Sequence, residues 1–306
     1  WNSREENNNR LRMKKLLLIL LCLPMIVFGQ QTYVPDDNFE AYLEAYGMGN
    51  GIANDDSVLT ANINTVTYLN LSGSGCGLSI SDLTGIESFL NLKQLFCESN
   101  LLTTLDLSQN SLLESLDCSS NRLIILDLSQ NLALNYLNCN DNELTSLDVS
   151  NNTALTYLHC GDNQLIDLNL SNSIIYLACS DNNLNILNVS YNSDLKSLYC
   201  GENQLTTLDI SQNTNLDTLD CCYNQLTILD VTSNNSLHFL NCYHNLLTTL
   251  DVRNGFNTLF SDFDCGNNPN LTCINVDDAN YSTTNWTNID PQHYFSNNCS
   301  GTTDLQ

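Results

Sequence analysis

The chain has 306 residues, of which 34 are acidic and 9 are basic, so its formal net charge at pH 7 is −25. Such an acidic surface repels phosphate groups, which makes nucleic acid and anionic membranes unfavourable partners. The length allows either two ordinary domains or one elongated repeat domain.

The N-terminal residues have the pattern of an export signal. Residues 1–12 precede the first methionine and are interpreted as a non-structural leader or remnant. Residues 13–29 start with two lysines, continue with an apolar run from Leu16 to Phe28, and end at Gly29, which suits the last position before a cleavage site. The run is shorter than the roughly 20 residues of a membrane-spanning helix. We therefore expect a cleaved signal peptide, no membrane span, and a secreted or cell-surface protein.

Residues 30–65 are expected to form an N-terminal cap. The segment "VPDDNFEAYLEAYG" begins with aspartates that suit the start of a helix. Phe39, Tyr42, Leu43 and Tyr46 then follow at helical spacing and give the helix an apolar face. We expect this face to cover the first coil of the array that follows.

Residues 66–276 repeat one unit. Its period is marked by cysteines that recur every 21 residues, apart from one step of 19. These are Cys97, Cys118, Cys139, Cys160, Cys179, Cys200, Cys221 and Cys242. The unit reads L-x-x-L-x-C-x-x-N-x-L-x-x-L-D-φ-S-x-N-x-x, with φ an aliphatic residue, and its first part matches the leucine-rich-repeat phrase. We predict an α/β-type leucine-rich-repeat solenoid of 21-residue coils, with a parallel sheet on one face, few or no regular helices in the repeats, and a small cap at each end.

Two columns of side chains within the unit are interpreted as structural. The asparagines are expected to satisfy backbone groups where each coil turns. They are Asn100, Asn121, Asn142, Asn163, Asn182, Asn203, Asn224 and Asn245. The cysteines are expected to be buried free thiols. A metal or redox ladder is the alternative, but stacked thiols point in parallel and no histidine column accompanies them.

The second arm of each coil carries a mainly acidic column. It consists of Asp106, Asp127, Asp148, Asn169, Asn188, Asp209, Asp230 and Asp251. Like charges stacked one strand apart repel one another, so turn hydrogen bonds or bound cations must compensate. Calcium accepts such oxygen ligands, but the unit lacks the glycine-rich nonapeptide of calcium-binding β-rolls. We favour an Asx-type turn, with calcium as the alternative, and assign no metal ligand or other cofactor.

Residues 277–306 are expected to form a C-terminal cap and tail. Phe263 and Cys265 belong to a degenerate coil before it, and residues 271–276 are predicted to form the last strand. Non-repetitive ends are typical of solenoids, because a terminal coil has no neighbour to cover its apolar side.

We make separate predictions for three cysteines that lie outside the column. Cys273 and Cys299 flank the closing cap, and we predict that they form a disulfide. Cys222 follows column residue Cys221 and is expected to point outward, which would make it the accessible free thiol.

The repeat, the opening "YVPDDNFEAYLE" and the closing "LTCINVDDANYSTTNWTNID" resemble secreted, internalin-like leucine-rich-repeat surface proteins of Bacteroidota-type bacteria. The resemblance covers roughly residues 31–300. It implies export and a role in adhesion or ligand binding, without naming a ligand. Members often continue into a C-terminal sorting domain, so this chain is expected either to be truncated or to use another route.

The residue pattern does not favour an enzyme. The carboxylates lie in surface columns rather than as a convergent pair in a pocket. The histidines lie on different coils and have no matching nucleophile; they are His159, His238, His244 and His293.

Outward aromatic residues on the predicted strands form the candidate ligand-binding site. They are Tyr136, Tyr157, Tyr176 and Phe239 before the inward leucine, and Phe96 and Tyr199 after it. Aromatic side chains on a rigid sheet suit protein hot spots or sugar faces, although tyrosine also simply suits a strand surface.

We therefore expect a monomeric, non-enzymatic, extracellular or cell-surface module that binds a protein or glycan through its sheet face. The alternative is a structural, acidic, calcium-decorated spacer with no specific macromolecular ligand.

Overall fold

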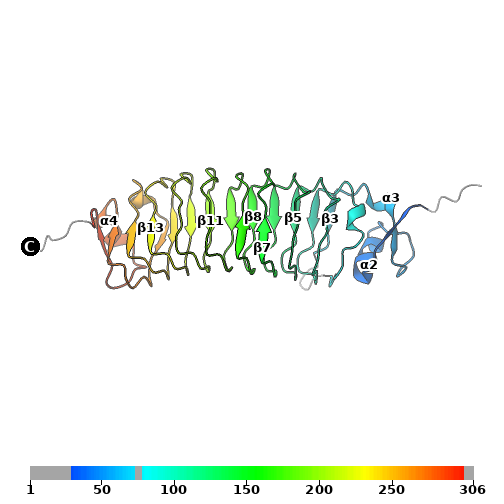
Figure 1. Ribbon diagram of the computed structural model, residues 1–306, viewed down its shortest axis with the longest axis horizontal. Helices are drawn as coiled ribbons and strands as arrows, with labels where there is room; N and C mark the ends of the chain where they lie inside the picture. The colour runs from blue at the N-terminus through cyan, green and yellow to red at the C-terminus, as the bar shows by residue number, and fades with distance from the viewer. Residues whose placement is uncertain (1–28, 73–77, 300–306) are drawn as a thin grey trace, which may run out of the picture.

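One long parallel sheet forms the main wall of the molecule. The computed structural model describes residues 29–72 and 78–299, with α2 (Asp37–Ala45) and α3 (Thr60–Ile63) at one end and α4 (Ala279–Asn285) at the other (Figure 1). Ten three-residue strands lie side by side across the long axis. In order they are β3 (Tyr68–Asn70), β4 (Gln94–Phe96), β5 (Ser115–Asp117), β6 (Tyr136–Asn138), β8 (Tyr157–His159), β10 (Tyr176–Ala178), β11 (Ser197–Tyr199), β12 (Thr218–Asp220), β14 (Phe239–Asn241) and β16 (Asp262–Asp264). The predicted solenoid architecture is confirmed.

Strand register follows the repeat residue by residue. Leu137 of β6 pairs with Leu158 of β8, which pairs with Leu177 of β10. Neighbouring strands of a sheet lie about 4.8 Å apart, and alternate side chains point to the same face. Each position of the repeat therefore forms a continuous row along the solenoid, inward for the leucines and outward for the residues on either side of them.

The core consists of nearly identical apolar layers. In a single coil, Leu134, Leu137, Cys139, Leu144, Leu147 and Val149 are all buried. Full burial of one leucine contributes about 1.5–3 kcal/mol. Only the adjacent coils can cover these side chains, so the stability of the solenoid comes from stacking.

The asparagine column closes the turn after each strand. Nδ2 of Asn142 donates to three carbonyl oxygens at 3.1–3.2 Å, those of Cys118, Cys139 and Asn140. Its Oδ1 accepts the N–H of Leu123 at 2.9 Å. Asn121 and Asn203 make the same set of bonds in their coils. The structural role predicted for this column is confirmed.

A second row of buried asparagines occupies the last asparagine position of the repeat unit, on the second arm, for which no role was predicted. It contains Asn110, Asn131, Asn152, Asn192, Asn213 and Asn234. Nδ2 of Asn131 donates to the carbonyls of Leu107 and Asn110 at 3.1 and 3.0 Å. Its Oδ1 is buried and has no hydrogen-bond partner among the described residues. This row therefore links adjacent coils through donated hydrogen bonds, while the Oδ1 atom of Asn131 accepts none from the described residues.

The second arm forms regular strands in only part of the array. β7 (Ser146–Asp148) pairs with β9 (Asp167–Asn169), and a four-stranded sheet contains β13 (Ile228–Asp230), β15 (Thr249–Asp251), β17 (Cys273–Asn275) and β18 (Tyr294–Ser296). Residues 271–276 were predicted to contain the last strand. That prediction is wrong, because β18 pairs in parallel with β17 beyond it.

The 19-residue coil shortens the turn of the second arm. Ser171 is buried near the position where the other coils have the second asparagine, and its hydroxyl lies 3.0 Å from that of Ser173. The Ser173 hydroxyl in turn donates to the carbonyl of Leu155 at 2.6 Å. Leu168 and Leu170 are only half-buried, unlike their counterparts in neighbouring coils. The solenoid thus accommodates a two-residue deletion with a local loss of packing.

The N-terminal end is covered by α2 and an antiparallel pair, β1 (Gln31–Tyr33) with β2 (Ser57–Leu59). Phe39 and Leu43 of α2 are fully buried, and Phe39 stacks on Phe89, in the connection between β3 and β4, with ring centroids 6.3 Å apart. That connection contains a short 3-10 helix, η1 (Ile86–Ser88). Tyr46 does not reach the core, because the helix ends before it, and its ring stacks on Tyr42 instead.

The C-terminal end is closed by an aromatic cluster and a disulfide. Trp286, just after α4, stacks on Phe263 of β16 with ring centroids 4.2 Å apart and also contacts Phe295 of β18. A second 3-10 helix, η2 (Asn257–Leu259), precedes β16. Cys273 of β17 is joined to Cys299 by a disulfide.

The predicted leader, the signal peptide up to residue 28, and the tail from residue 300 lie outside the described residues. Within residues 29–72 and 78–299, none of the helices has the length and apolar character required to cross a membrane.

Candidate binding face of the ten-stranded sheet

Tyrosines from consecutive strands line up on the outer face of the sheet. The register pairs Tyr136 of β6 with Tyr157 of β8, and Tyr157 with Tyr176 of β10. Each precedes the inward leucine of its strand, so all three occupy the same outward row. Their side chains are half-buried by contact with one another and with the sheet.

These rings form a continuous stack. Tyr136 and Tyr157 have ring centroids 4.6 Å apart with an interplanar angle of 13°, and Tyr157 and Tyr176 are 4.4 Å apart at 4°. Tyr199 belongs to the other outward row, yet its ring lies 5.6 Å from that of Tyr176 at a tilt of 43°. We call these four residues the tyrosine stack. Aromatic pairs of this kind contribute about 0.5–1.5 kcal/mol beyond the area that they bury.

The other two predicted site residues lie apart from the tyrosine stack. Phe96 of β4 is separated from it by β5, which presents Ser115 and Asp117, and its ring contacts Tyr68 at 5.8 Å. Phe239 of β14 is separated from Tyr199 by β12. The structure therefore brings together four of the six predicted residues.

The phenols of the tyrosine stack are neutral hydrogen-bonding groups. Burial and, after it, the carboxylates of Asp117 and Glu98 raise the pKa of Tyr136. Burial is also the main reason why the pKa values of the other three members are raised. The hydroxyls therefore stay protonated around neutral pH and can both donate and accept hydrogen bonds.

An acidic row borders this face where each coil leaves the sheet. It consists of exposed residues two positions after the column cysteine, with left-handed backbone: Asp141 (φ 55°), Asp162 (φ 48°), Asp181 (φ 57°) and Glu202 (φ 52°). Burial and then the neighbouring carboxylates of Asp181 and Asp141 raise the pKa of Asp162. We call these four residues the acidic turn row. The sequence signal for it is C-x-[D/E]-N, which recurs in four consecutive coils.

Adjacent coils pack closely between the tyrosine stack and the acidic turn row. A Cβ at Gly161 would lie 3.0 Å from the side chain of Asn140 and 3.1 Å from the carbonyl oxygen of Ser180, so the backbones of adjacent coils pack closely there. His159 lies in the neighbouring outward row, and burial lowers its pKa. It is therefore mostly neutral at neutral pH, which leaves the local charge negative.

The acidic column of the second arm is accounted for by turn hydrogen bonds. Oδ1 of Asp106, Asp127 and Asp148 each accepts the backbone N–H of the serine two residues later at 2.9 Å. Hydrogen bonding to the backbone N–H and the side chain of that serine lowers the pKa of Asp106 and Asp127, and the serine side chain is the larger cause for Asp148. The predicted Asx-type turn is confirmed for these residues.

The cysteine column is fully buried. All eight column thiols are inaccessible, and burial raises their pKa, for example to about 12 for Cys139 and Cys179. Cys222 is half-buried, and burial followed by a hydrogen bond to Asp220 raises its pKa to about 12. It is thus more accessible than the column, as expected, but is a poor nucleophile, because only the thiolate reacts.

A thiol-labelling experiment checks this arrangement. At pH 8 we expect no modification of the column cysteines in the folded protein, and modification of Cys222 roughly a hundredfold or more slower than that of free cysteine, because so little of it is thiolate. Peptide mapping of alkylated sites identifies each position, and denatured protein gives the control in which all free thiols react. Rapid labelling of Cys139 in the folded chain would contradict the buried column.

A separate hollow of about 850 Å³ lies on the second arm near the N-terminal end. Its lining includes Ile124, Ile125 and Thr104, together with Asp106 and Asp127. It is open, and these two aspartates already accept turn hydrogen bonds through Oδ1, whereas ligand pockets are concave sites that bury most of the ligand surface. We therefore place the candidate site on the sheet face.

Comparison with known proteins identifies relatives of this architecture. No protein-family model matches the chain. The structure of the functional domain of internalin J from Listeria monocytogenes, described as including a cysteine ladder, superposes with a TM-score of 0.71 at 37% identity. The match covers 81% of this chain and 57% of that one. That structure is thus described as having a cysteine ladder, and this chain has a column of buried cysteines.

Two further comparisons also match internalins of Listeria monocytogenes. Internalin J of Listeria monocytogenes serotype 4b is 40% identical over 79 residues, which are 26% of this chain and 8% of that protein. Internalin C2 of Listeria monocytogenes superposes with a TM-score of 0.57 at 20% identity, covering 72% of this chain and 99% of that one, and shows the fold alone. The chain spans only about half, or less, of the internalin J chains that it matches.

Proposed function

Because this chain is an internalin-like leucine-rich-repeat protein, homologous to the internalins of Listeria, we propose that it is a non-enzymatic extracellular binding protein. Its ligand is another protein, held on the outer face of the ten-stranded sheet at the tyrosine stack. Leucine-rich-repeat solenoids present extended surfaces of this kind to their partners.

The observation that carries the proposal is the tyrosine stack itself. Four aromatic side chains lie on consecutive strands of a rigid sheet, on the side away from the core. Large, half-exposed aromatic side chains with polar tips are characteristic of protein hot spots, because they bury much area with little loss of conformational freedom.

The geometry of the rings favours a protein ligand over a glycan. A sugar ring packs against an exposed aromatic face, but Tyr157 has Tyr136 on one face and Tyr176 on the other. The central ring therefore offers its edge and its hydroxyl group rather than its face. Ring edges and hydroxyls suit backbone amides and side chains of a polypeptide.

Charge favours a partner with basic side chains. The acidic turn row borders the tyrosine stack. Residues 30–306 contain only four basic residues, Lys93, Arg122, Lys196 and Arg253. Complementary charge at the rim of an interface accelerates association and is weakened by salt.

An enzymatic function has little support in the geometry. The group that most resembles a catalytic set is Cys265, whose Sγ lies 3.8 Å from Nδ1 of His293, with Asp290 nearby. Both Cys265 and His293 are buried, and burial raises the pKa of the thiol well above its ordinary value. A buried sulfur is closed to a substrate, and the raised pKa disfavours the thiolate needed for attack.

The test is a binding screen followed by one matched pair of variants. Residues 30–306 are screened against arrays of extracellular proteins and glycans, and the affinity of any ligand is measured by surface plasmon resonance. Loss of one aromatic contact costs about 1–2 kcal/mol, so we expect Tyr157→Ser to bind roughly five- to thirty-fold more weakly.

The control is Tyr191→Ser, which removes a tyrosine that is 72% exposed and lies away from the sheet. It should bind as tightly as the parent, and circular dichroism should show both variants folded. Equal affinity of Tyr157→Ser and the parent, or ligands found only on the glycan array, would overturn the proposal. Absence of any ligand would favour the acidic spacer instead.

A further inference from the structure

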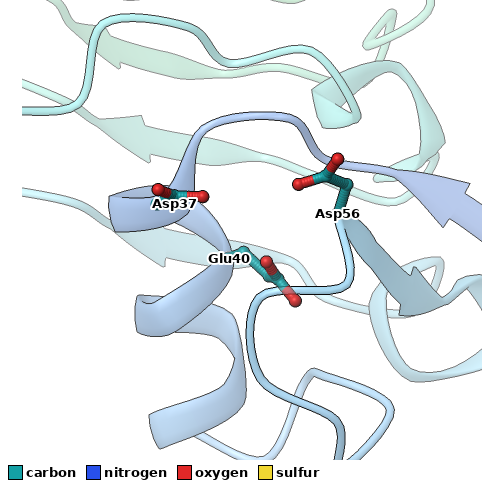
Figure 2. A group of neighbouring side chains, drawn as sticks. All are labelled: Asp37, Glu40 and Asp56. Carbon is teal, nitrogen blue, oxygen red and sulfur yellow. The ribbon is translucent and has the colours of Figure 1, made fainter.

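Three carboxylates from two segments of the N-terminal cap face one another. Asp37 and Glu40 lie in the first turn of α2, and Asp56 lies immediately before β2. Each residue has one carboxylate oxygen that can serve as a ligand, and these three oxygens all lie within 4.8 Å of one another. Figure 2 shows the three side chains around a common space between the start of the helix and the segment that carries Asp56.

Local backbone structure holds both segments in place. Oδ1 of Asp36, the residue before α2, accepts the backbone N–H groups of Asn38 and Phe39 at 3.0 Å and fixes the first turn. Asp56 has left-handed backbone, with φ 55°, and its carbonyl accepts the N–H of Val34 at 2.9 Å. The arrangement of the three carboxylates therefore follows from the fold of the cap.

The central carboxylate is buried and incompletely satisfied. Glu40 is only 1% exposed. Its Oε1 accepts the N–H of Asp55 at 3.1 Å, whereas its Oε2 is buried and has no hydrogen-bond partner among the described residues. Burial of a carboxylate oxygen without a partner is costly, so natural proteins retain it only where something else compensates.

Basic side chains of the cap cannot supply that compensation. Residues 30–65 contain six acidic residues and no lysine, arginine or histidine. The ion pairs found among the described residues all lie elsewhere in the chain. The positive end of the helix dipole favours Asp37 and Glu40 in the first turn, but it explains neither the approach of Asp56 nor the unpartnered oxygen.

We propose that Asp37, Glu40 and Asp56 bind one calcium ion, which ties the start of α2 to the segment before β2. The donors are all oxygens, which calcium and magnesium prefer, and no nitrogen or sulfur ligand is present that would select a softer metal. Calcium–oxygen distances of about 2.3–2.6 Å place opposite ligands about 4.6–5.2 Å apart, a range that accommodates this spacing. Magnesium demands a smaller, nearly ideal octahedron.

The site stabilises the cap where it covers the first coil. α2 carries Phe39 against Phe89, and Oδ2 of Asp36 accepts the N–H of Ser81 at 2.8 Å. An ion at the start of α2 therefore strengthens the element that shields the first layer of the core. Calcium sites of extracellular modules commonly have dissociation constants of about 0.1–1 mM.

The experiment measures calcium binding to residues 30–306 by equilibrium dialysis in 150 mM NaCl, where diffuse attraction to the acidic surface is screened. We expect one ion per chain with a dissociation constant of about 0.1–1 mM, weaker binding of magnesium, and slower proteolysis of the cap in calcium. Absence of a saturable calcium site in the parent protein overturns the proposal without any variant, as does equal affinity for magnesium.

Two variants locate the site, and a third serves as the control. Glu40→Gln and Asp56→Asn should each lose the saturable site. Asp127→Asn should retain it, because it removes one carboxylate from the second-arm column, where Asn169 and Asn188 occur naturally. Retention of binding by Glu40→Gln, or its loss in Asp127→Asn, overturns the assignment.

Thermal unfolding separates ligation from a purely structural role for Glu40. In a calcium-free chelating buffer, Glu40→Gln should melt at or above the temperature of the parent, because it no longer buries an unpaired charge. In 5 mM calcium the order should reverse. A Glu40→Gln variant that is less stable by the same amount in both buffers would show that Glu40 has a structural role and binds no ion.

Discussion

Replacing Asn142 by alanine is expected to lower the free energy of unfolding by about 3 kcal/mol. The substitution removes three donated hydrogen bonds and leaves the buried N–H of Leu123 without its acceptor. The carbonyl of Cys118 keeps its bond from Asn121, and that of Cys139 keeps its bond from Asn163. Most of the loss therefore comes from the unsatisfied Leu123 N–H, whose hydrogen exchange should accelerate most.

Asn131→Ala is the matched comparison, because Asn131 is also buried and lies on the other arm. Its amide donates only to the carbonyls of Leu107 and Asn110, and both keep bonds from backbone N–H groups. Its Oδ1 accepts nothing from the described residues. We expect a loss of about 1 kcal/mol, measured by denaturant unfolding followed by circular dichroism. Similar losses in the two variants would contradict the distinct roles given to the two rows.

Removal of the bond between Cys273 and Cys299 is expected to destabilise the C-terminal end by about 3 kcal/mol. The two residues are 26 apart in sequence, and closure of a loop of that length restricts the unfolded chain by about this amount. Each coil contacts only its neighbours, so the loss should be confined to β17, β18, α4 and the coil beneath them. Hydrogen exchange of the Cys273→Ser/Cys299→Ser protein resolves where protection is lost.

Reduction of the parent protein supplies the control for this variant. The disulfide is the only one among the described residues, so the reduced parent and the double variant should lose protection in the same segments. Mass mapping without reducing agent should recover the peptide pair that contains both cysteines. Free thiols at both positions, or protection unchanged by reduction, would contradict the prediction.

The repeated part of the fold could be predicted because one unit constrains every coil. Leu137, Cys139 and Asn142 have the same environment as their equivalents one coil away, so a single periodic pattern specifies strand, register and turn together. The ends could not be predicted in this way. β18 follows a non-repetitive segment, and its pairing with β17 depends on how α4 and Trp286 pack on the last coil.

Residues of the candidate sites could be predicted only where they recur with the 21-residue repeat. Tyr136, Tyr157 and Tyr176 occupy one outward row, so their stacking follows from register. Tyr199 joins them from the adjacent row through the direction of its side chain, which a residue pattern does not specify. The three carboxylates of the cap, where no metal site was expected, come from a segment without a repeat. The pairing of β1 with β2 brings Asp56 to the start of α2.

The orientation of the strands also determines how the molecule responds to a pulling force. They lie across the long axis, so the hydrogen bonds of the ten-stranded sheet run along it. A force applied at the two ends acts along these hydrogen bonds. The coils are therefore expected to separate one after another, because each interface between neighbouring coils carries the whole force. Each 21-residue coil that detaches releases about 70 Å of extended chain. If a bound ligand is pulled by flow, the chain should therefore lengthen in steps, one coil at a time, while the remaining coils stay folded.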